Sequence, residues 1–583
     1  MNLSTFKDNP RLWLTLLLAA VQGLILFRLH VAIETEHWPA TDLRWLTFFY
    51  TSVVLVPVTI HLLSAHWRDR MLWIAVGVMV LVCAGLGWQF GTNVGNPPEG
   101  IVDGEAAWVL GLTLTLLWLL CMPFLRCRLE LGRWRYGYDA LFSTAWQNKL
   151  TLLEAALFTG AFWLLLGLWA VLFKTLGYDI FEDIFTDEAF IYPFTAITFG
   201  LSMHLIGSVE KLVSVAREQI LGLLKWLAPV AALILLLFTP TLLFKLPNLV
   251  FEGERAIGAA WLLWLTAVTV ALLNAAYQNG APEKPYPRWL GLVLRFIVPL
   301  MPIVAAVAIY ALIVRIGEYG VTVARVYGLI VAGAGLVYAM GYAIAAVRSG
   351  PWMRGIERVN VVVALALIAT LLLTFTPILS PYRFAADSQA ARVLNVREAE
   401  LEDVIRTLQF DAGAYGRRHV ERFASLTGGE QEQATARLAR SMRELTNRWA
   451  PALARPEEIA ESVRVYPEGH AIEPALSREI AQHVRSHGGG PRNDDLRDRS
   501  LLFVDLNGDA VEEAVLLSRM GAAMFQKDGN VWRHTGHGVI TYDEKRRSTL
   551  FENLAAGRYT VVSPEFSDLR IGDEVISVSP LRQ

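Results

Sequence analysis

Residues 150–173 read LTLLEAALFTGAFWLLLGLWAVLF, and this stretch decides the fold class of the chain. It holds one charged residue, Glu154, in 24 positions. A helix of this length rises about 1.5 Å per residue and therefore crosses the roughly 30 Å hydrocarbon core of a bilayer. The stretch predicts a membrane-spanning helix.

Ten further stretches among the first 382 residues share this apolar character. Each is long enough to cross a bilayer as a helix, which gives eleven predicted spans. One short stretch contains Pro193 and His204. The ten stretches are Leu12–Ile33, Leu43–Ala65, Met71–Phe90, Glu105–Leu125, Ala189–Gly207, Gly222–Phe244, Ala256–Tyr277, Trp289–Ile313, Ala324–Val347 and Val359–Pro377.

The composition of the whole chain is a mixture of two parts. Hydrophobic residues make up 54% of the 583 residues and charged residues 18%, whereas soluble domains average about 45–50% and about 25%. The last 201 residues hold 58 charged residues, and the first 382 hold 48. The composition excludes an ordinary soluble enzyme, and a net charge of -2 gives no reason to expect a nucleic-acid partner.

The positive residues between the predicted spans are distributed unevenly. With the N-terminus in the cytoplasm, the cytoplasmic segments carry 17 Lys and Arg residues and the opposite segments carry six. Cytoplasmic loops of membrane proteins are enriched in positive residues in this way. Because eleven is an odd number, the region after the last span is predicted to lie outside the cytoplasm.

The region after the last span changes character twice. Arg383–His487 is rich in Ala, Glu, Arg and Leu and predicts helices, while the short apolar runs from Leu501 onward predict strands. We predict an α-helical polytopic membrane protein of about eleven spans with a C-terminal extracytoplasmic α+β domain. Its predicted parts are a bundle (1–380), a helical segment (381–490) and a small β-rich module (491–583).

The most distinctive local motif is FVDLNGDAVEEAVLL, residues 503–517. Its oxygen-bearing side chains, at relative positions 1, 3, 5 and 9 of a tight loop, could surround one hard cation such as Ca²⁺. The motif resembles the strand–loop–strand calcium loops of the FG-GAP type, with Ala510 in place of the usual Gly. The alternative is a hairpin turn whose acids keep it solvated. The predicted ligands of a structural calcium ion are Asp505, Asn507, Asp509 and Glu513.

Polar residues inside the predicted spans are the default candidates for transport or chemistry. Most of them lie near a predicted helix end, where a long side chain reaches the membrane surface. His204 and Arg295 are less easily explained in this way, and they are the predicted transport candidates. The full set is Arg28, His30, His61, Glu154, His204, Asn274 and Arg295.

Several segments of the chain together resemble a known family. They include residues 157–181 (LFTGAFWLLLGLWAVLFKTLGYDIF), FIYPFTAITFG, NAAYQNG, PYPRWL, YGVTVARVYGL, ERVN, SPYRFAADSQAARVL and FDAGAYGRR. In this order they are similar to the bacterial multi-pass membrane family catalogued as domain of unknown function 4153. The resemblance covers most of the chain. It implies a bacterial membrane protein and supplies no catalytic residues.

These observations leave two main functions open. The first is a non-enzymatic protein of the bacterial inner (plasma) membrane, acting as a sensor, scaffold or assembly factor through its extracytoplasmic domain, with the bilayer and another envelope protein as partners. The second is a transporter or a lipid or solute translocase with a path through the bundle. The chain shows no common hydrolase, P-loop, zinc-protease or kinase signature. A third option, a transferase using a lipid-linked donor, would need the acidic segment Asp179–Glu188.

Overall fold

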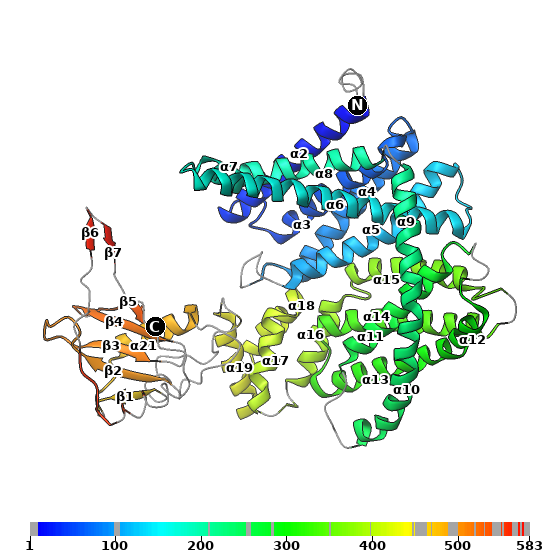
Figure 1. Cartoon of the computed structure of the whole chain (residues 1–583). Helices are drawn as coiled ribbons and strands as arrows, with labels where there is room; N and C mark the ends of the chain where they lie inside the picture. The colour runs from blue at the N-terminus through cyan, green and yellow to red at the C-terminus, as the bar shows by residue number, and fades with distance from the viewer. Residues whose placement is uncertain are drawn as a thin grey trace. The chain divides into compact units, whose positions relative to one another are not determined.

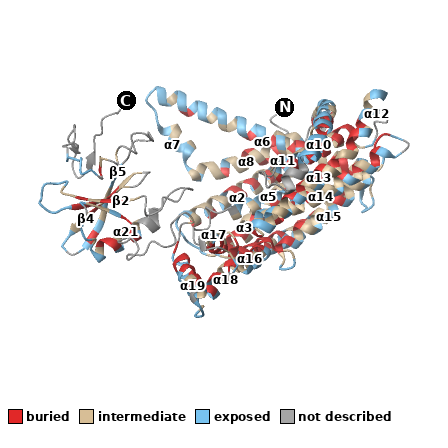
Figure 2. Cartoon of the chain, turned by 90° about the horizontal axis from the view of Figure 1, so that it is seen from below, coloured by how far each residue is buried: buried red, intermediate tan, exposed pale blue. Residues whose placement is uncertain are grey.

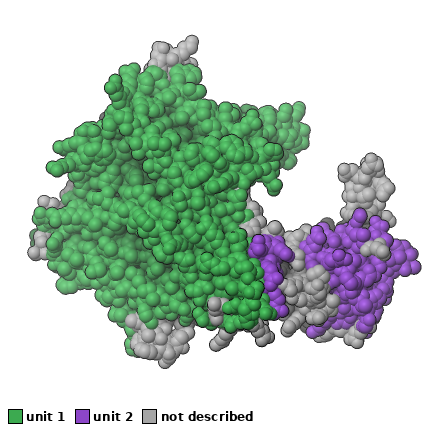
Figure 3. Space-filling model, turned by 180° about the vertical axis from the view of Figure 1, so that it is seen from behind, with its two compact units in different colours: residues 1–436 green, residues 437–583 purple. Residues whose placement is uncertain are grey.

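The computed structural model places most of the chain in two compact units, residues 1–436 and 437–583, which are coloured separately in Figure 3. The described residues are 10–97, 105–207, 210–251, 258–280, 285–348, 351–393, 395–396, 398–445, 448, 463–467, 469–487, 499–517, 521–529, 531–538, 550, 553–554, 556–561, 569–571 and 574–576.

Eleven helical segments among the described residues are long and apolar enough to cross a membrane, which confirms the predicted number. Ala256, the predicted start of the eighth span, lies outside the described residues. The main helices of the spans are α2 (Pro10–Glu34), α3 (Leu43–Leu62), α4 (Arg70–Val94), α5 (Glu105–Leu131), α6 (Tyr138–Thr175), α8 (Glu188–Gly207), α10 (Ala228–Phe251), α11 (Ala259–Tyr277), α13 (Met301–Tyr319), α14 (Val323–Val347) and α15 (Ile356–Phe375) (Figure 1).

Two spans are built from more than one helix. In the seventh, α9 (Glu210–Leu224) continues through η2 (Lys225–Leu227) into α10. In the ninth, α12 (Arg288–Ile297) continues through η3 (Val298–Leu300) into α13. Pro299 and Pro302 lie at this second junction and cannot donate backbone hydrogen bonds, which explains the break. The remaining short elements of the bundle are η1 (Ser64–His66) and α7 (Ile180–Thr186).

Large apolar side chains cover the outside of the spanning helices. Leu81 is 75% exposed, Phe244 85% and Phe296 81%. Much of α6 is exposed along its length, as the pale blue ribbon in Figure 2 shows. So much exposed apolar surface is typical of contact with lipid and would be unusual for a protein in water.

Hydrogen bonds between helix ends define two opposite faces of the bundle. On the face that holds the start of α2, which we call the N-terminal face, Arg126 of α5 donates to Asn148 of α6 over 2.8 Å. On the C-terminal face, the backbone N–H of Leu43 donates to Asn96 over 3.0 Å. Each contact joins helix ends that an alternating path of eleven spans would bring to the same side.

Three helices follow the last span at the C-terminal face. They are α16 (Pro381–Arg392), α17 (Glu398–Phe410) and α18 (Gly413–Ala424). Of these, α16 and α18 contact spanning helices, and α17 packs on α16 and α18. Gln389 donates to the backbone carbonyls of Tyr319 and Val321 over 2.9 and 3.0 Å, and Arg392 donates to that of Glu318 over 2.9 Å. The carbonyls of Glu318 and Tyr319 are at the end of α13 and have no partner within that helix, and that of Val321 lies in the turn before α14. The next helix, α19 (Glu430–Arg443), follows α18.

The second unit contains a five-stranded sheet in the order β1–β2–β3–β4–β5. Its apolar side chains pack against α21 (Pro474–His487), with Leu476 and Ile480 of the helix meeting Phe503 and Phe525 of the sheet. A separate antiparallel pair consists of β6 (Leu569–Ile571) and β7 (Glu574–Ile576). The strands of the main sheet are β1 (Arg464–Tyr466), β2 (Ser500–Val504), β3 (Glu513–Leu517), β4 (Ala522–Asp528) and β5 (Val531–Gly538).

Two local predictions in this unit are wrong. Strand β1 lies in a segment predicted to be helical, and it pairs in parallel with β2, a non-local contact that a local pattern does not reveal. The run YTVV (559–562) is one of the short apolar runs after Leu501 that predict strands, but its described residues, Tyr559–Val561, form none.

The predicted fold class is confirmed: a mostly helical chain with eleven candidate membrane spans precedes a small mixed-sheet domain at residues 464–538. The predicted division at residues 380 and 490 stays a prediction, because compactness alone does not show which parts fold independently. The boundary between the two compact units lies in the sequence between Ala436 and Arg437.

Candidate functional site

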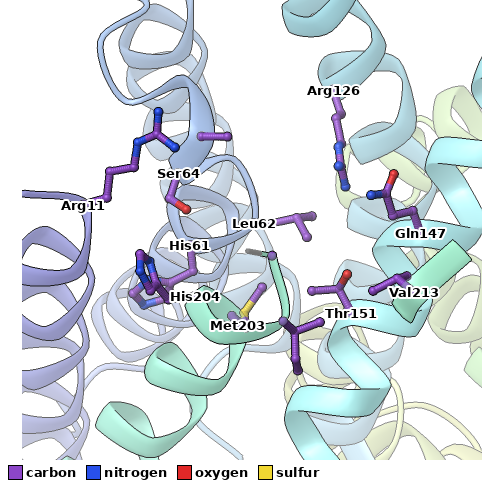
Figure 4. A pocket seen from close by; sticks show the side chains of 13 residues that line it. Arg11, His61, Leu62, Ser64, Arg126, Gln147, Thr151, Met203, His204 and Val213 are labelled. Carbon is purple, nitrogen blue, oxygen red and sulfur yellow. The ribbon is translucent and has the colours of Figure 1, made fainter. Parts of the chain in front are cut away.

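A partly enclosed cavity of about 100 Å³ lies at the N-terminal face. Its walls come from the start of α2, the end of α3, the last turns of α5 and α8, the first half of α6, and α9. None of the described residues that line it is acidic. The polar side chains on its walls are Arg11, His61, Ser64, Arg126, Gln147, Thr151 and His204 (Figure 4).

His61, in the last turn of α3, is the most deeply buried polar group of this cavity. The residue is 4% exposed, and among the described residues neither ring nitrogen has a hydrogen-bond partner. Gly200 of α8 makes room for the ring, since a Cβ at that position would lie 3.2 Å from Nε2. A buried polar group without a partner costs about 1–3 kcal/mol. The imidazole therefore favours a polar occupant of the cavity.

Arg11 and His204 lie on the same side of the cavity as His61. Figure 4 shows the Arg11 side chain near Ser64, with the rings of His61 and His204 close to each other. Arg11 also lies close enough to act electrostatically on His204. One positive side chain and two imidazoles, from three helices, are thus concentrated on one wall.

Arg126 occupies the opposite wall with Gln147 (Figure 4). Its Nε donates to Glu130 over 2.7 Å and its Nη1 donates to Asn148 over 2.8 Å. These bonds hold the guanidinium in place, and with five N–H donors it retains capacity for a further acceptor. The buried Nδ2 of Asn148 has no partner among the described residues.

The two predicted transport candidates are in different places. His204 lines the cavity, whereas Arg295 does not. Arg295 lies in the last turn of α12, and its Nη2 donates to the backbone carbonyl of Pro351 over 3.4 Å. Both residues are near the ends of their spans. Their role in transport stays a prediction.

A second polar cluster on the N-terminal face joins three spanning helices and the start of α6. Asn360 donates to Tyr138 and to Asn274, and it accepts a hydrogen bond from Tyr342, each over 2.7 Å. Asn274 belongs to the quoted segment NAAYQNG and Asn360 to ERVN. Because the amide of Asn360 is fully engaged, this cluster is suited to fixing helix packing.

Three potential metal ligands meet on the C-terminal face. His30 Nε2 lies 3.0 Å from a carboxylate oxygen of Glu188 and 3.4 Å from one of Glu34. The ligand atoms lie within 4.8 Å of one another, a spacing that could accommodate a divalent cation. Glu34 is exposed and Glu188 is half-buried, and a His–carboxylate ion pair explains the same geometry.

The structure brings the four predicted calcium ligands together in the β2–β3 loop. Asp505 accepts backbone N–H bonds from Gly508 (2.7 Å) and Ala510 (3.0 Å). Glu513, which is 3% exposed, accepts from the Leu506 N–H (2.8 Å) and the Asn507 side chain (2.9 Å). The loop thus binds many of its own donors, and calcium binding stays a prediction.

Ala510 occupies the position of the usual glycine in this loop. Ala510 has φ +65°, in the left-handed region that favours glycine. The chain thus adopts this left-handed conformation in spite of the methyl group.

Sequence reasoning missed the convergence of Arg11, His61 and Arg126. The two arginines contributed only to the positive-residue count, and His61 was one of seven polar groups in the spans. The alternation of spans was the available signal, because it places these three helix ends on one face.

Comparison with known proteins extends this description. A model of the family described as "Domain of unknown function (DUF4153)" matches residues 1–418, which include all eleven spans and part of α18. No curated protein and no solved structure matches the chain. Because the match covers well over half of its length, the chain belongs to the DUF4153 family.

Proposed function

We propose that this protein is a non-enzymatic component of the bacterial cell envelope that acts as a sensor, scaffold or assembly factor through its C-terminal region. The observation that carries the proposal is the attachment of α16 to the end of α13 by Gln389 and Arg392. A segment bound in this way transmits force or displacement to the spanning helices. A partner bound beyond the last span could therefore alter the bundle, or be held by it.

The polar groups of the spans support the same function. Thr47 and Thr51 of α3 donate to the backbone carbonyls of Gly87 and Cys83 in α4, over 2.6 and 2.8 Å. Gln22 of α2 donates to the carbonyl of Val53 over 3.0 Å. Such bonds hold helices together in an apolar medium. They are typical of a bundle built as a stable support.

The proposed location is the inner membrane, with the N-terminus in the cytoplasm and the C-terminal domain outside it. The excess of positive residues in the predicted cytoplasmic segments supports this orientation. The bilayer is one partner, and another envelope protein is the proposed second partner.

Truncation tests the proposal. A chain ending at Gly428 keeps α16–α18 on the bundle and lacks α19 and everything after it. We expect it to insert and remain folded but to lose crosslinks to its envelope partner and to lose cellular function. A chain ending at Tyr382, which also lacks most of α16, should in addition lose stability. Full function and an unchanged set of crosslinked partners in the Gly428 truncation would contradict the proposal.

A translocase is the second candidate, because His204 lines a polar cavity. Flux of a substrate across liposomes should then fall when His204 or Arg295 is replaced by Ala. Flux that is unchanged in the double variant would exclude both residues as gates.

A further inference from the structure

The cavity on the N-terminal face has the chemistry of an anion site. Arg11 and Arg126 supply positive charge, the two histidines offer ring N–H donors, and no described lining residue is acidic. Glu130 pairs with Arg126 from outside the set of lining residues. The cavity therefore favours a negatively charged occupant with several acceptor atoms.

We propose that this cavity binds a phosphate group, carried either by an anionic lipid or by a free phosphate ion. The site is independent of the envelope function proposed above, since it lies on the opposite face of the bundle from α16–α18.

The buried imidazole is the first argument for a ligand. His61 is 96% buried by residue area, lines the cavity and has no partner for either ring nitrogen among the described residues. An apolar occupant would leave it unsatisfied, and a metal cation would be repelled by Arg11. A phosphate oxygen can accept the ring N–H.

The arrangement of the donors is the second argument. Figure 4 shows Arg11 and Ser64 on one wall and Arg126, Gln147 and Thr151 toward the other. A phosphate group presents oxygens in several directions and can accept from both walls together. A single carboxylate is planar and would reach fewer of these donors.

The position along the helices is the third argument. The lining residues from α2, α3, α5 and α8 lie in the first or last two turns of candidate spanning helices, so the cavity is near one end of the bundle, where lipid headgroups would meet the protein. Basic pockets between membrane helices bind anionic headgroups at this depth.

The experiment uses the full chain purified in a maltoside detergent that contains no phosphate. Its melting temperature is measured with inorganic phosphate, with phosphatidylglycerol, and with digalactosyl diacylglycerol as a lipid without phosphate. A shift caused by inorganic phosphate identifies the free ion as a ligand. A shift caused by phosphatidylglycerol alone identifies the lipid headgroup. No shift with either phosphate source overturns the proposal, as does an equal shift with the glycolipid.

Two variants locate the site. Arg11→Gln changes an exposed residue that should not affect folding, and His61→Phe keeps a ring of similar shape. Each should weaken the apparent affinity about tenfold or more, which equals about 1.4 kcal/mol. Gel filtration checks that His61→Phe is folded. If His61→Phe is misfolded, Arg11→Gln alone tests the site.

Arg70→Gln is the matched control. Arg70 is exposed at the start of α4 on the same face and does not line the cavity. Its affinity should remain that of the unmodified chain. An equal loss in Arg70→Gln would show diffuse attraction to the positive surface and would overturn the proposal, as would full affinity in both site variants.

Discussion

Asn93 of α4 donates a hydrogen bond from its side-chain amide to the backbone carbonyl of Phe375, the last residue of α15, over 2.9 Å. The hydroxyl of Tyr415 in α18 donates to the Oδ1 of the same asparagine over 3.4 Å. One buried side chain thus links the third span, the last span and a helix that follows the bundle.

Replacing Asn93 by Leu should destabilise the protein by about 1–3 kcal/mol, because it leaves a buried carbonyl and a hydroxyl without partners. The change can be measured as a lower melting temperature in detergent and as faster proteolysis within α16–α18. Thr92→Ala is the control, since the Thr92 hydroxyl bonds only to its own helix at Trp88 among the contacts described. Equal melting temperatures of the two variants would contradict a stabilising role for the bonds of Asn93.

The docking of α18 depends on Gly413. This glycine has φ +61°, and a Cβ at its position would lie 2.6 Å from the backbone oxygen of Asn93. Gly413→Ala should therefore separate α18 from α4 and increase hydrogen exchange in α18. Gly429→Ala should have no such effect, because a Cβ there meets no atom within 4 Å. Unchanged exchange in Gly413→Ala would show that the close approach is not required.

The asparagine network should show strong coupling in a double-mutant cycle. Asn360→Ala removes the partner of three side chains at once, while Tyr138→Phe removes only one hydroxyl from the same network. The double variant should be more stable than the sum of the two losses predicts, by about 0.5–2 kcal/mol, because the groups are in direct contact. Additive losses in thermal melting would mean that the network contributes no cooperative stability.

The second unit should lose part of its stability in acid through Glu473. Hydrogen bonds from Lys527 (2.5 Å) and Trp532 (3.0 Å) hold the pKa of the Glu473 carboxyl below its ordinary value of 4.5. The folded pKa is lower than the unfolded one, so the stabilisation is present above about pH 4.5 and is lost as the pH falls through the folded pKa. The side chain is 47% exposed, which limits the contribution to about 1 kcal/mol or less.

Hydrogen exchange of β4 and β5 measures this effect. Glu473→Gln should exchange faster than the unmodified chain at neutral pH, and the difference should shrink in acid, as the pH falls below about 4.5. Asp528→Asn, at the exposed end of β4, should not alter exchange at either pH. A difference that persists in acid would assign the effect to packing and not to ionisation.

Calcium binding at the β2–β3 loop can be tested by ion removal. If the four predicted residues bind Ca²⁺, the ion at about 100 times its Kd should stabilise the second unit by about 2.7 kcal/mol, and EDTA should reverse the gain. Asp505→Asn should abolish this response. Glu512→Gln lies in the same loop outside the predicted ligand set and should preserve it. Identical exchange with Ca²⁺ and with EDTA would reject calcium for this loop.

The spanning helices could be predicted from sequence because a bilayer imposes a minimum apolar length on each of them. Strand β1 could not, because its pairing with β2 depends on a contact across an intervening helix. The cavity could be predicted from sequence only in part. Alternation of the spans places Arg11, His61 and His204 on one face, but the rotation of each helix decides whether their side chains meet.

The bond between Asn93 and Phe375 also has a consequence for biosynthesis. The two residues are 282 positions apart, and a ribosome adding about 5–20 residues per second needs about 14–56 s to reach the second after the first. Throughout that interval the nascent chain contains the amide of Asn93, but its acceptor, the carbonyl of Phe375, has not yet been synthesised. Chains arrested before the last span should therefore leave the amide of Asn93 without its acceptor, so the third span can be fixed in place only after the last span has been made.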